Sequence, residues 1–386
     1  MDKYTTYVGM DVHARSVTAK ALNIRTGEMF SKRFETGYCA AEISDWIDST
    51  LARPVLCAYE SGVTGIWLAR DLITLGIDCE VIAISTLPTS QKDRKQKCDK
   101  HDAQVILREM TNPSKDYSAI YIPDERTEAE RDLCRAREKA AIRLRQARQE
   151  LSSFLLRHGH TWNERTGSGC LKKSRGRAYE KWLDAISFAE PACEMTFSFL
   201  RRHAKTAEEE LHSIEASLSE VAQSDENKPY VDALSLIKGI SRTSAMLIKA
   251  EVGRFSRFSS GRKVSSWIGC VPKNHSSGER EVSGRITKAG NKYIRRCLVE
   301  GAASLPNWLT AVKPRCAPEL PAAVVSKADD ANKRLHERYR YLKDERGKHI
   351  NKARMAVVSE MMRWIWVIGL MVEREQEKKT DQAACQ

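Results

Sequence analysis

Four acidic residues in the first third of the chain are spaced so that they could bind a divalent metal ion. Asp11 and Glu60 each end an apolar run, and Asp99 and Asp102 lie three residues apart, which places both on one face of a helix. Carboxylate oxygens are the ligands that Mg²⁺ prefers in proteins. Metal ions held in this way polarise a scissile phosphate. The alternative is that acids are common at strand ends and helix starts, where Asp99 alone could be an N-cap.

A polar stretch in the last third of the chain carries a second set of reactive groups, in which Ser276 and Ser277 stand directly before Gly278. A serine hydroxyl attacks a phosphodiester when its proton is removed and the developing charge is neutralised. The cations that follow closely could supply that neutralisation: Arg280, Arg285, Lys288, Lys292, Arg295 and Arg296. The same stretch also fits an ordinary turn, in which serine and glycine serve the backbone.

The elements that would position the four acids follow an α+β pattern. Alternating apolar residues predict a meander of three strands over residues 7–11, 16–22 and 29–34. Helix and strand patterns then alternate: a helix over 41–51, a strand over 55–59, a helix over about 64–75, a strand over 79–84, and a helix that opens near Asp99. This order is expected of an RNase H-like sheet. An actin-like nucleotide-binding fold also begins with a meander, but Asp11 is not followed by the glycine-rich turn that phosphates need.

The middle of the chain, residues 124–223, has few helix breakers and many charges, which predicts long helices. A narrow apolar stripe at steps of three and four suits helix pairing, so we expect a coiled-coil connector; its members are Leu211, Ile214, Leu218 and Val221. The first of these helices is rich in arginine. That charge fits either a solvated face or a phosphate-binding surface, and the sequence leaves both open.

The last third of the chain is predicted to be mostly helical. Gly239 stands at a tight turn between two helices, which could present backbone amides to a phosphate or could be a simple helical corner. A helix over 260–268, a loop over 270–285 and a basic helix from about Lys288 follow, and two further helices end the chain. The apolar stretch 355–372 is short and interrupted by Glu360 and Arg363, so we interpret it as a buried helix.

Composition favours a polyanionic partner. The formal net charge is +13, an excess that is typical of proteins that bind nucleic acid. The eleven cysteines include no Cys-x-x-Cys pair, so neither a zinc knuckle nor a disulfide framework is indicated, and a reducing cytosol fits. The first residues lack the apolar run of a signal peptide.

Taken together, these blocks of sequence resemble the insertion-sequence-110 transposases, the DEDD-type recombinases that are guided by a bridge RNA. The resemblance rests on segments in the family's order: residues 7–11, 59–62 and 99–103 in the first third, and 239–258, 269–272, 277–278 and 287–291 in the last. Two positions depart from the family pattern. Ser241 replaces the common second glycine of the interhelical turn, and Cys98 stands where a threonine usually precedes the acidic pair.

The resemblance implies a RuvC-like domain over residues 1–120, a coiled-coil connector over 121–226 and a mostly helical transposase domain over 227–386. It implies that Asp11, Glu60, Asp99 and Asp102 hold Mg²⁺ and that Ser277 is the nucleophile, with Ser276 a lesser candidate. We further expect contacts to nucleic acid from Lys92, Arg94, Arg135, Arg143, Lys273, Arg285, Lys288, Lys292 and Arg295.

The partners that the resemblance implies are donor DNA, target DNA, a noncoding guide RNA that selects both by base pairing, and further copies of the chain in a dimer or tetramer. A bacterial cytoplasmic location without membrane contact is expected. Two alternatives remain at this point: a RuvC-like junction nuclease that uses water as its nucleophile, and a nucleic-acid-binding protein without catalysis. The first makes Ser277 dispensable, and the second predicts salt-sensitive binding without strand cleavage.

Overall fold

The structure is a computed structural model, and it describes residues 3–37, 39–83, 99–114, 117–163, 176–277, 280–306 and 319–384. Of residues 99–101, 273–277, 280–285 and 383–384 it describes the backbone alone. The chain forms two compact units, Met1–Asp124 and Glu125–Gln386. The expected α+β chain with a mostly helical C-terminal part is confirmed.

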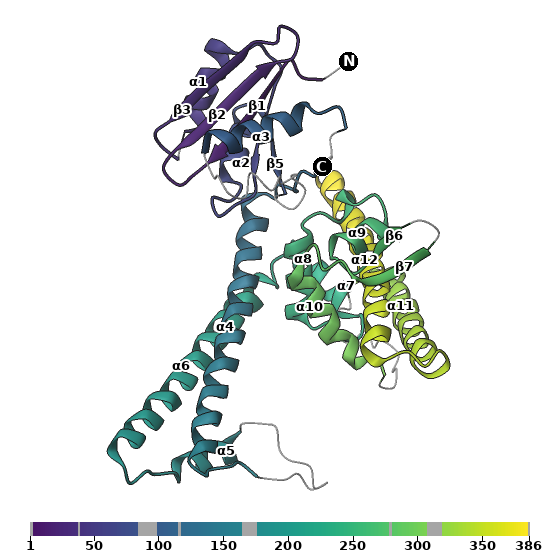
Figure 1. The fold of residues 1–386 in the computed structure, drawn as a ribbon. Coiled ribbons are helices and arrows are strands. Elements are labelled where there is room, and N and C mark those ends of the chain that lie inside the picture. Colours follow the sequence, from purple (N-terminus) through teal and green to yellow (C-terminus); the bar gives the residue numbers. More distant parts are fainter. Residues whose placement is uncertain are drawn as a thin grey trace. The chain divides into compact units, whose positions relative to one another are not determined.

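A five-stranded mixed sheet forms the centre of the first unit (Figure 1). Its strands lie in the order β3-β2-β1-β4-β5. The first three strands form the predicted antiparallel meander, and β4 and β5 run parallel to β1. Their bounds are β1 Thr6–Val12, β2 Val17–Asn23, β3 Met29–Phe34, β4 Val55–Glu60 and β5 Asp78–Ile82.

Helices cover both faces of this sheet because successive side chains of each strand point to opposite sides. Val8 and Met10 of β1 belong to a core that contains the apolar sides of α1 (Ala40–Thr50) and α2 (Trp67–Thr74). The opposite face packs against α3 (Asp99–Thr111) through a second, smaller core. The acidic positions of α3 therefore come from a helix that lies directly on the sheet.

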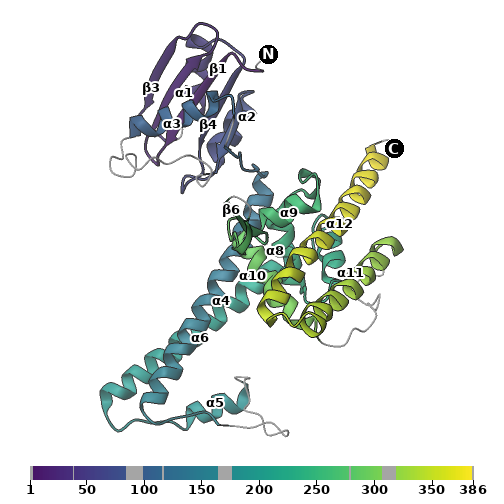
Figure 2. The ribbon, with the colours of Figure 1, turned by 45° about the vertical axis from the view of Figure 1, so that its right-hand side comes forward.

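Two long helices, α4 (Glu125–Arg157) and α6 (Pro191–Val221), lie side by side in the second unit (Figures 1 and 2). Arg137 pairs with Glu215 and Arg148 with Glu208, so the helices run antiparallel. The short helix α5 (Arg177–Asp184) adds Tyr179 and Leu183 to the core between their distal ends. The predicted long helices are therefore present.

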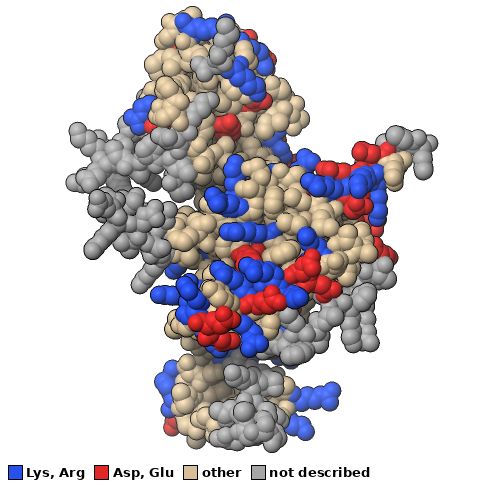
Figure 3. Space-filling view, turned by 90° about the vertical axis from the view of Figure 1, so that its right-hand side faces the viewer, with Lys and Arg blue, Asp and Glu red and all other residues tan. Residues whose placement is uncertain are grey.

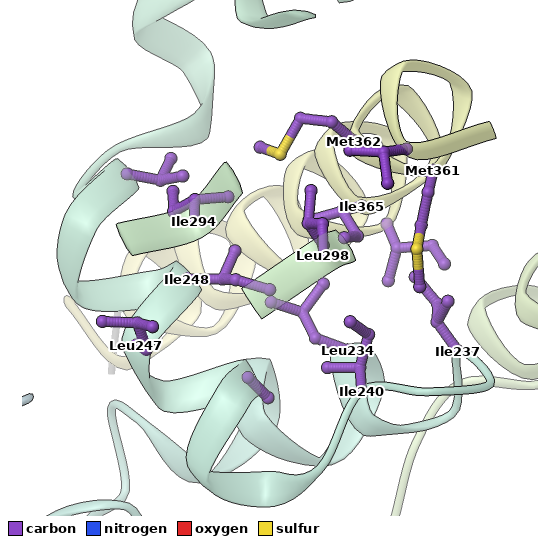
Figure 4. Close-up of a cluster of buried hydrophobic side chains, with 14 of the residues drawn as sticks. Leu234, Ile237, Ile240, Leu247, Ile248, Ile294, Leu298, Met361, Met362 and Ile365 are labelled. Atoms are coloured by element: carbon purple, nitrogen blue, oxygen red, sulfur yellow. The ribbon is translucent and has the colours of Figure 1, made fainter. Parts of the chain in front are cut away.

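The remaining helices of the second unit enclose its largest hydrophobic core. Figure 4 shows Leu234, Ile248, Leu298, Met361 and Ile365 converging from different helices. The helices of this bundle are α7 Lys228–Ser235, α8 Arg242–Val252, α9 Gly261–Trp267, α10 Lys292–Gly301, α11 Ala322–Arg340 and α12 Ile350–Ala384, with short turns of helix at Phe255–Arg257, Ala302–Ser304 and Tyr341–Glu345.

Helix α12 is the apolar helix that the sequence predicts to be buried. By length and composition, its portion Ile350–Gln382 could cross a membrane. Instead, Val358, Met361 and Ile365 are fully buried in the core of the bundle, where α12 packs against α7, α9, α10 and α11. The interpretation as a core helix is confirmed.

The segment predicted as a loop over residues 270–285 is a β-hairpin. Strand β6 (Pro272–Ser277) pairs antiparallel with β7 (Arg280–Ile286). The prediction was wrong because only Val282 and Ile286 are apolar beyond Pro272, so the sequence lacks the period-two pattern of a half-buried strand. Backbone pairing forms this hairpin without that pattern. Helix α10 also begins later than predicted, at Lys292, because Lys288 and Gly290 have positive φ.

Candidate functional site

Asp11 and Glu60 lie at neighbouring positions on the sheet. Strands β1 and β4 are parallel, and their register pairs Met10 with Tyr59. Met10 and Tyr59 both belong to the core on the α1 and α2 side. Alternation therefore turns the next residue of each strand, Asp11 and Glu60, to the face that α3 covers. Adjacent strands are about 4.8 Å apart, so the two acids start from one edge of one face.

Gly9 brings α3 close to the end of β1. A Cβ atom at this position would lie 2.5 Å from the carbonyl oxygen of Ala103 and 2.6 Å from the backbone nitrogen of Leu107. No side chain fits in that space, so the glycine two residues before Asp11 allows the helix backbone to rest on the strand. Asp102 precedes Ala103 directly, so the same contact fixes its position relative to β1.

A second contact holds the first turns of α3 over the meander. Lys20 on β2 donates a hydrogen bond from Nζ to Gln104 Oε1 at 3.0 Å, and Lys20 is the register partner of Gly9. Ile106 and Leu107 continue the contact into the core. The position of Asp102 is thus set by the packing of the residues that directly follow it in α3.

His13 is a site residue that the sequence reasoning missed. Its Nε2 atom lies 3.0 Å from Asp11 Oδ2, and the Asp11 side chain is 14% exposed. The imidazole lies beside this carboxylate, in the loop after β1. Its place two residues beyond Asp11 at a strand end was a signal that the sequence did offer.

The carboxylates fit a hard divalent cation by their chemistry, because the donor set is oxygen only. Asp11, Glu60 and Asp102 are partly exposed at the α3 side of the sheet. Asp99 is the first residue of α3, and its side chain lies outside the described residues. Among the residues that the structure describes, no three His, Cys, Asp or Glu side chains already stand together as a metal-binding group.

Ser277 is the last residue of strand β6. Its backbone pairs with Arg280 across the hairpin, and Ser276 pairs with Glu281. The side chains of both serines, and those of Lys273 and Arg285, are outside the described residues. The described backbone therefore places Ser277 at the far end of a two-stranded ribbon, away from the base where β6 and β7 join the bundle.

The base of this hairpin is closed by backbone contacts between distant residues. Thr287 N donates to Val271 O at 2.9 Å, and Asn291 N donates to Trp267 O at 3.1 Å. Gly290 has φ +125°, and a Cβ there would lie 2.0 Å from the carbonyl oxygen of Trp267. Only glycine fits this position, so its presence in the sequence is explained by the close approach of the two segments.

Gly239 has a packing role at the predicted interhelical turn. Its φ is +90°, and a Cβ there would lie 2.2 Å from the carbonyl oxygen of Gly301 on α10. The backbone nitrogen of Lys238 donates to Asn332 Oδ1 at 2.7 Å. These contacts account for the turn as a helical corner; the phosphate-binding alternative stays a prediction.

The cations predicted to contact nucleic acid fall into three groups. The side chains of four are outside the described residues: Lys92, Arg94, Lys273 and Arg285. Two others form structural contacts: Arg135 pairs with the buried Glu251, and Arg295 donates from Nη1 to the carbonyl oxygen of Ile268. Three are exposed on the surface of the second unit, and these remain available for contacts to phosphate: Arg143, Lys288 and Lys292.

The arginines of α4 serve the packing of the second unit more than the sequence suggested. Arg137 and Arg148 bind acids of α6, and Arg131 and Arg135 bind Glu251 of α8. On the face shown in Figure 3, basic and acidic side chains are interspersed over the helical bundle. Many of the arginines of α4 therefore form ion pairs with acidic side chains of the helices that face it.

Comparison with known proteins finds similarity to transposases. A family model for a transposase, DEDD_Tnp_IS110, matches residues 8–159, and a second, described as Transposase IS116/IS110/IS902 family, matches residues 231–313. A Sinorhizobium fredii protein, y4qE, whose name calls it a transposase, is 32% identical over 322 residues, which are 82% of this chain and 75% of that protein. The transposase for insertion sequence element IS1533 of Leptospira borgpetersenii is 28% identical, and the match covers 90% of this chain and 99% of the relative.

Proposed function

This chain belongs to the IS110 family of transposases, and we propose that it cuts and rejoins DNA through a covalent phosphoserine intermediate formed by Ser277. As a member of this family, the chain is an enzyme that cleaves DNA and transfers DNA strands. The DEDD name of the matching model implies a divalent metal.

We assign the first unit to the RNase H-like, RuvC-like folds. The assignment is supported by the sheet order β3-β2-β1-β4-β5, with an antiparallel meander followed by two parallel strands. It is also supported by acids at the carboxyl ends of β1 and β4. We take residues 1–120 as this domain, 121–226 as the connector and 227–386 as the transposase domain.

The observation that carries the proposal is the placement of Asp11 and Glu60 on one edge of one face, under the helix that bears Asp99 and Asp102. These four carboxylates would hold Mg²⁺. The bound ion would neutralise charge on the phosphate under attack. His13 would keep the Asp11 carboxylate oriented toward the ion from the loop that follows β1.

The serine step exchanges one phosphodiester for another. The Ser277 hydroxyl loses its proton, its Oγ bonds to phosphorus, and the bond from phosphorus to the leaving sugar oxygen breaks. That oxygen takes up a proton and becomes a free hydroxyl end. A hydroxyl end of the partner DNA then attacks the phosphoserine, which restores the serine and joins the new strands without an external energy source.

We further propose that the serine of one copy acts with the acids of another, so that the active protein is at least a dimer. A noncoding guide RNA would select donor and target DNA by base pairing, while the protein holds the backbones. The exposed Arg143, Lys288 and Lys292 are candidates for such contacts. Because its relatives are bacterial, the reaction is assigned to the bacterial cytoplasm.

The test is to incubate the protein with Mg²⁺, donor DNA, target DNA and the RNA transcribed beside its gene, and then to look for a protein–DNA adduct that survives SDS. We expect Ser277→Ala to abolish the adduct while RNA binding stays intact. The matched control is Ser276→Ala, which should keep the adduct. An adduct that persists in Ser277→Ala rejects the nucleophile, and cleavage without any adduct in the unmodified protein would indicate a junction nuclease that uses water.

A further inference from the structure

Glu251 is a buried carboxylate at the centre of the second unit. It lies on α8, and its side chain is 1% exposed. Arg135 of α4 binds both of its oxygens, from Nε to Oε1 at 2.7 Å and from Nη2 to Oε2 at 2.9 Å. Arg131, one turn earlier on α4, lies 3.8 Å from Oε2. A buried charge needs such partners, so this carboxylate ties α8 firmly to α4.

The same carboxylate also reaches the base of the Ser277 hairpin. Asn291 donates from Nδ2 to Glu251 Oε2 at 2.7 Å. The other side-chain atom of Asn291, Oδ1, accepts from Ile294 N at 3.0 Å and so caps α10. The backbone nitrogen of Asn291 bonds to Trp267 O at the end of α9. Asn291 is thus held at three points, and Glu251 is the one that links it to α4.

These contacts form a chain of fixed geometry from α4 to the hairpin. Arg135 and Glu251 form a bidentate pair, which restricts both side chains more than a single contact would. Gly290, directly before Asn291, has no room for a side chain against Trp267. Since β7 ends only a few residues before Gly290, a shift of Asn291 would move the base from which the hairpin projects.

We propose that Glu251 is a positioning residue, which sets the orientation of the Ser277 hairpin relative to α4 through Arg135 and Asn291. The inference rests on the proposed role of Ser277. Arg135, which the sequence analysis predicted to contact nucleic acid, is assigned here to the positioning of the hairpin. In this role Glu251 contacts neither DNA nor metal. It affects the reaction only because it helps to position Ser277.

A second buried ion pair between α4 and α8 makes it possible to separate a positioning role from a merely structural one. Glu130 of α4 is also a buried carboxylate, and it accepts from Lys249 of α8 at 2.6 Å. Asn227 donates to it as well, at 2.7 Å. This pair joins the same two helices close to Glu251, and among the described residues Glu130 contacts Arg126, Asn227 and Lys249, none of which belongs to the hairpin base. Glu130→Gln is therefore the control for Glu251→Gln.

The experiment compares Glu251→Gln, Glu130→Gln and Asn291→Ala for thermal unfolding, DNA affinity and the single-turnover rate of adduct formation at saturating DNA. We expect both glutamine variants to lower the unfolding temperature by similar amounts. Only Glu251→Gln and Asn291→Ala should slow the adduct step, by at least about tenfold, since a misplacement of about 1 Å can cost roughly a hundredfold. DNA affinity should not change, and Glu251→Asp should recover part of the rate.

The double variant Glu251→Gln/Asn291→Ala adds a test of coupling. If both residues act through one path, the double variant should be no slower than the slower single variant. Rates that fall equally in Glu130→Gln and Glu251→Gln would overturn the proposal, and so would an unchanged rate in Asn291→Ala. If the unmodified protein forms no adduct through Ser277, the proposed function fails first. An adduct with an unaltered rate in Glu251→Gln rejects only the positioning role.

Discussion

The acids of the first unit and the serine of the second are held in place by two different kinds of structure. Asp11 and Glu60 extend strands that lie inside a sheet with a hydrophobic core on each face. Ser277 ends one strand of a separate two-stranded ribbon. The ribbon is fixed at its base by glycines, backbone hydrogen bonds and the Glu251–Asn291 contact.

The difference teaches where each group is vulnerable. The packing of the two cores fixes the positions of the acids, so the acids move only if the sheet or α3 moves. The serine depends on a few polar contacts between residues that are far apart in sequence, such as Glu251 and Asn291. Substitutions that leave both cores intact should therefore displace the serine and spare the acids.

The largest effect is expected from the acids themselves. Asp11→Asn should reduce strand cleavage by about a thousandfold or more, because a metal centre supplies several kcal/mol of charge stabilisation. Removal of divalent metal with a chelator should have a similar effect. Asp78→Asn is the control, since Asp78 is exposed and pairs with Lys3 and Tyr4 at the start of β5. Cleavage assays on both variants that gave equal rates would argue against the acid site.

Gly9→Ala should be the next most damaging change, although it alters no reactive group. The added Cβ meets the backbone of Ala103 and Leu107, and overpacking of this kind costs about 1–3 kcal/mol. We expect a lower unfolding temperature of the first unit and a loss of cleavage as α3 moves. Gly27→Ala is the comparison, because Gly27 has φ +77° with no atom within 4 Å, so only the cost of about 1 kcal/mol for its backbone conformation applies. Equal losses in the two variants would contradict the close packing of α3 on β1.

Gly290→Ala should act on the base of the hairpin and spare the first unit. Its Cβ would clash with the carbonyl of Trp267, so the base of the ribbon must shift while the first unit keeps its stability. We expect faster amide hydrogen exchange in β6 and β7 and at least about tenfold slower adduct formation. Gly347→Ala tests for a general effect of glycine replacement, because Gly347 has φ +56° with no atom within 4 Å. Unchanged exchange in Gly290→Ala would show that the base tolerates the shift.

The smallest effect is expected for the alkylation of two buried thiols, one in each region. This measurement compares how firmly the two regions are held and alters no reactive group. Burial raises the pKa of Cys57 in β4 to about 12 and that of Cys270 at the hairpin base to about 11. Both thiols are protonated at pH 8 in the folded protein, so both should resist alkylation there. Their raised pKa values stabilise the fold below the ordinary thiol pKa, and this contribution is lost as pH rises toward 11 and 12. Cys57 is fully buried inside the sheet and Cys270 is 5% exposed, so Cys270 should be alkylated before Cys57 as pH rises, as mass spectrometry would show; the reverse order would contradict the weaker hold on the hairpin base.

The sequence predicts the region that depends on local pattern and fails where distant residues meet. The strands of the first unit and the positions of Asp11 and Glu60 at their ends follow from period-two alternation. The hairpin was missed because its strands are polar. The ion pair of Arg135 with Glu251 joins residues 116 positions apart, so sequence alone could not separate it from a phosphate contact. His13 could have been found from the sequence, because it directly follows the first strand and lies two residues beyond Asp11.

The most direct test of the account is to identify the residue that carries DNA after the reaction is trapped in Mg²⁺. Trypsin cleavage after Lys273 and Arg280 releases residues 274–280, which contain both serines, and fragmentation of that peptide distinguishes Ser276 from Ser277. We expect the nucleotide mass on Ser277. The same mass on Ser276 or on another residue, or an unmodified peptide from a sample whose DNA has been cut, would contradict the account.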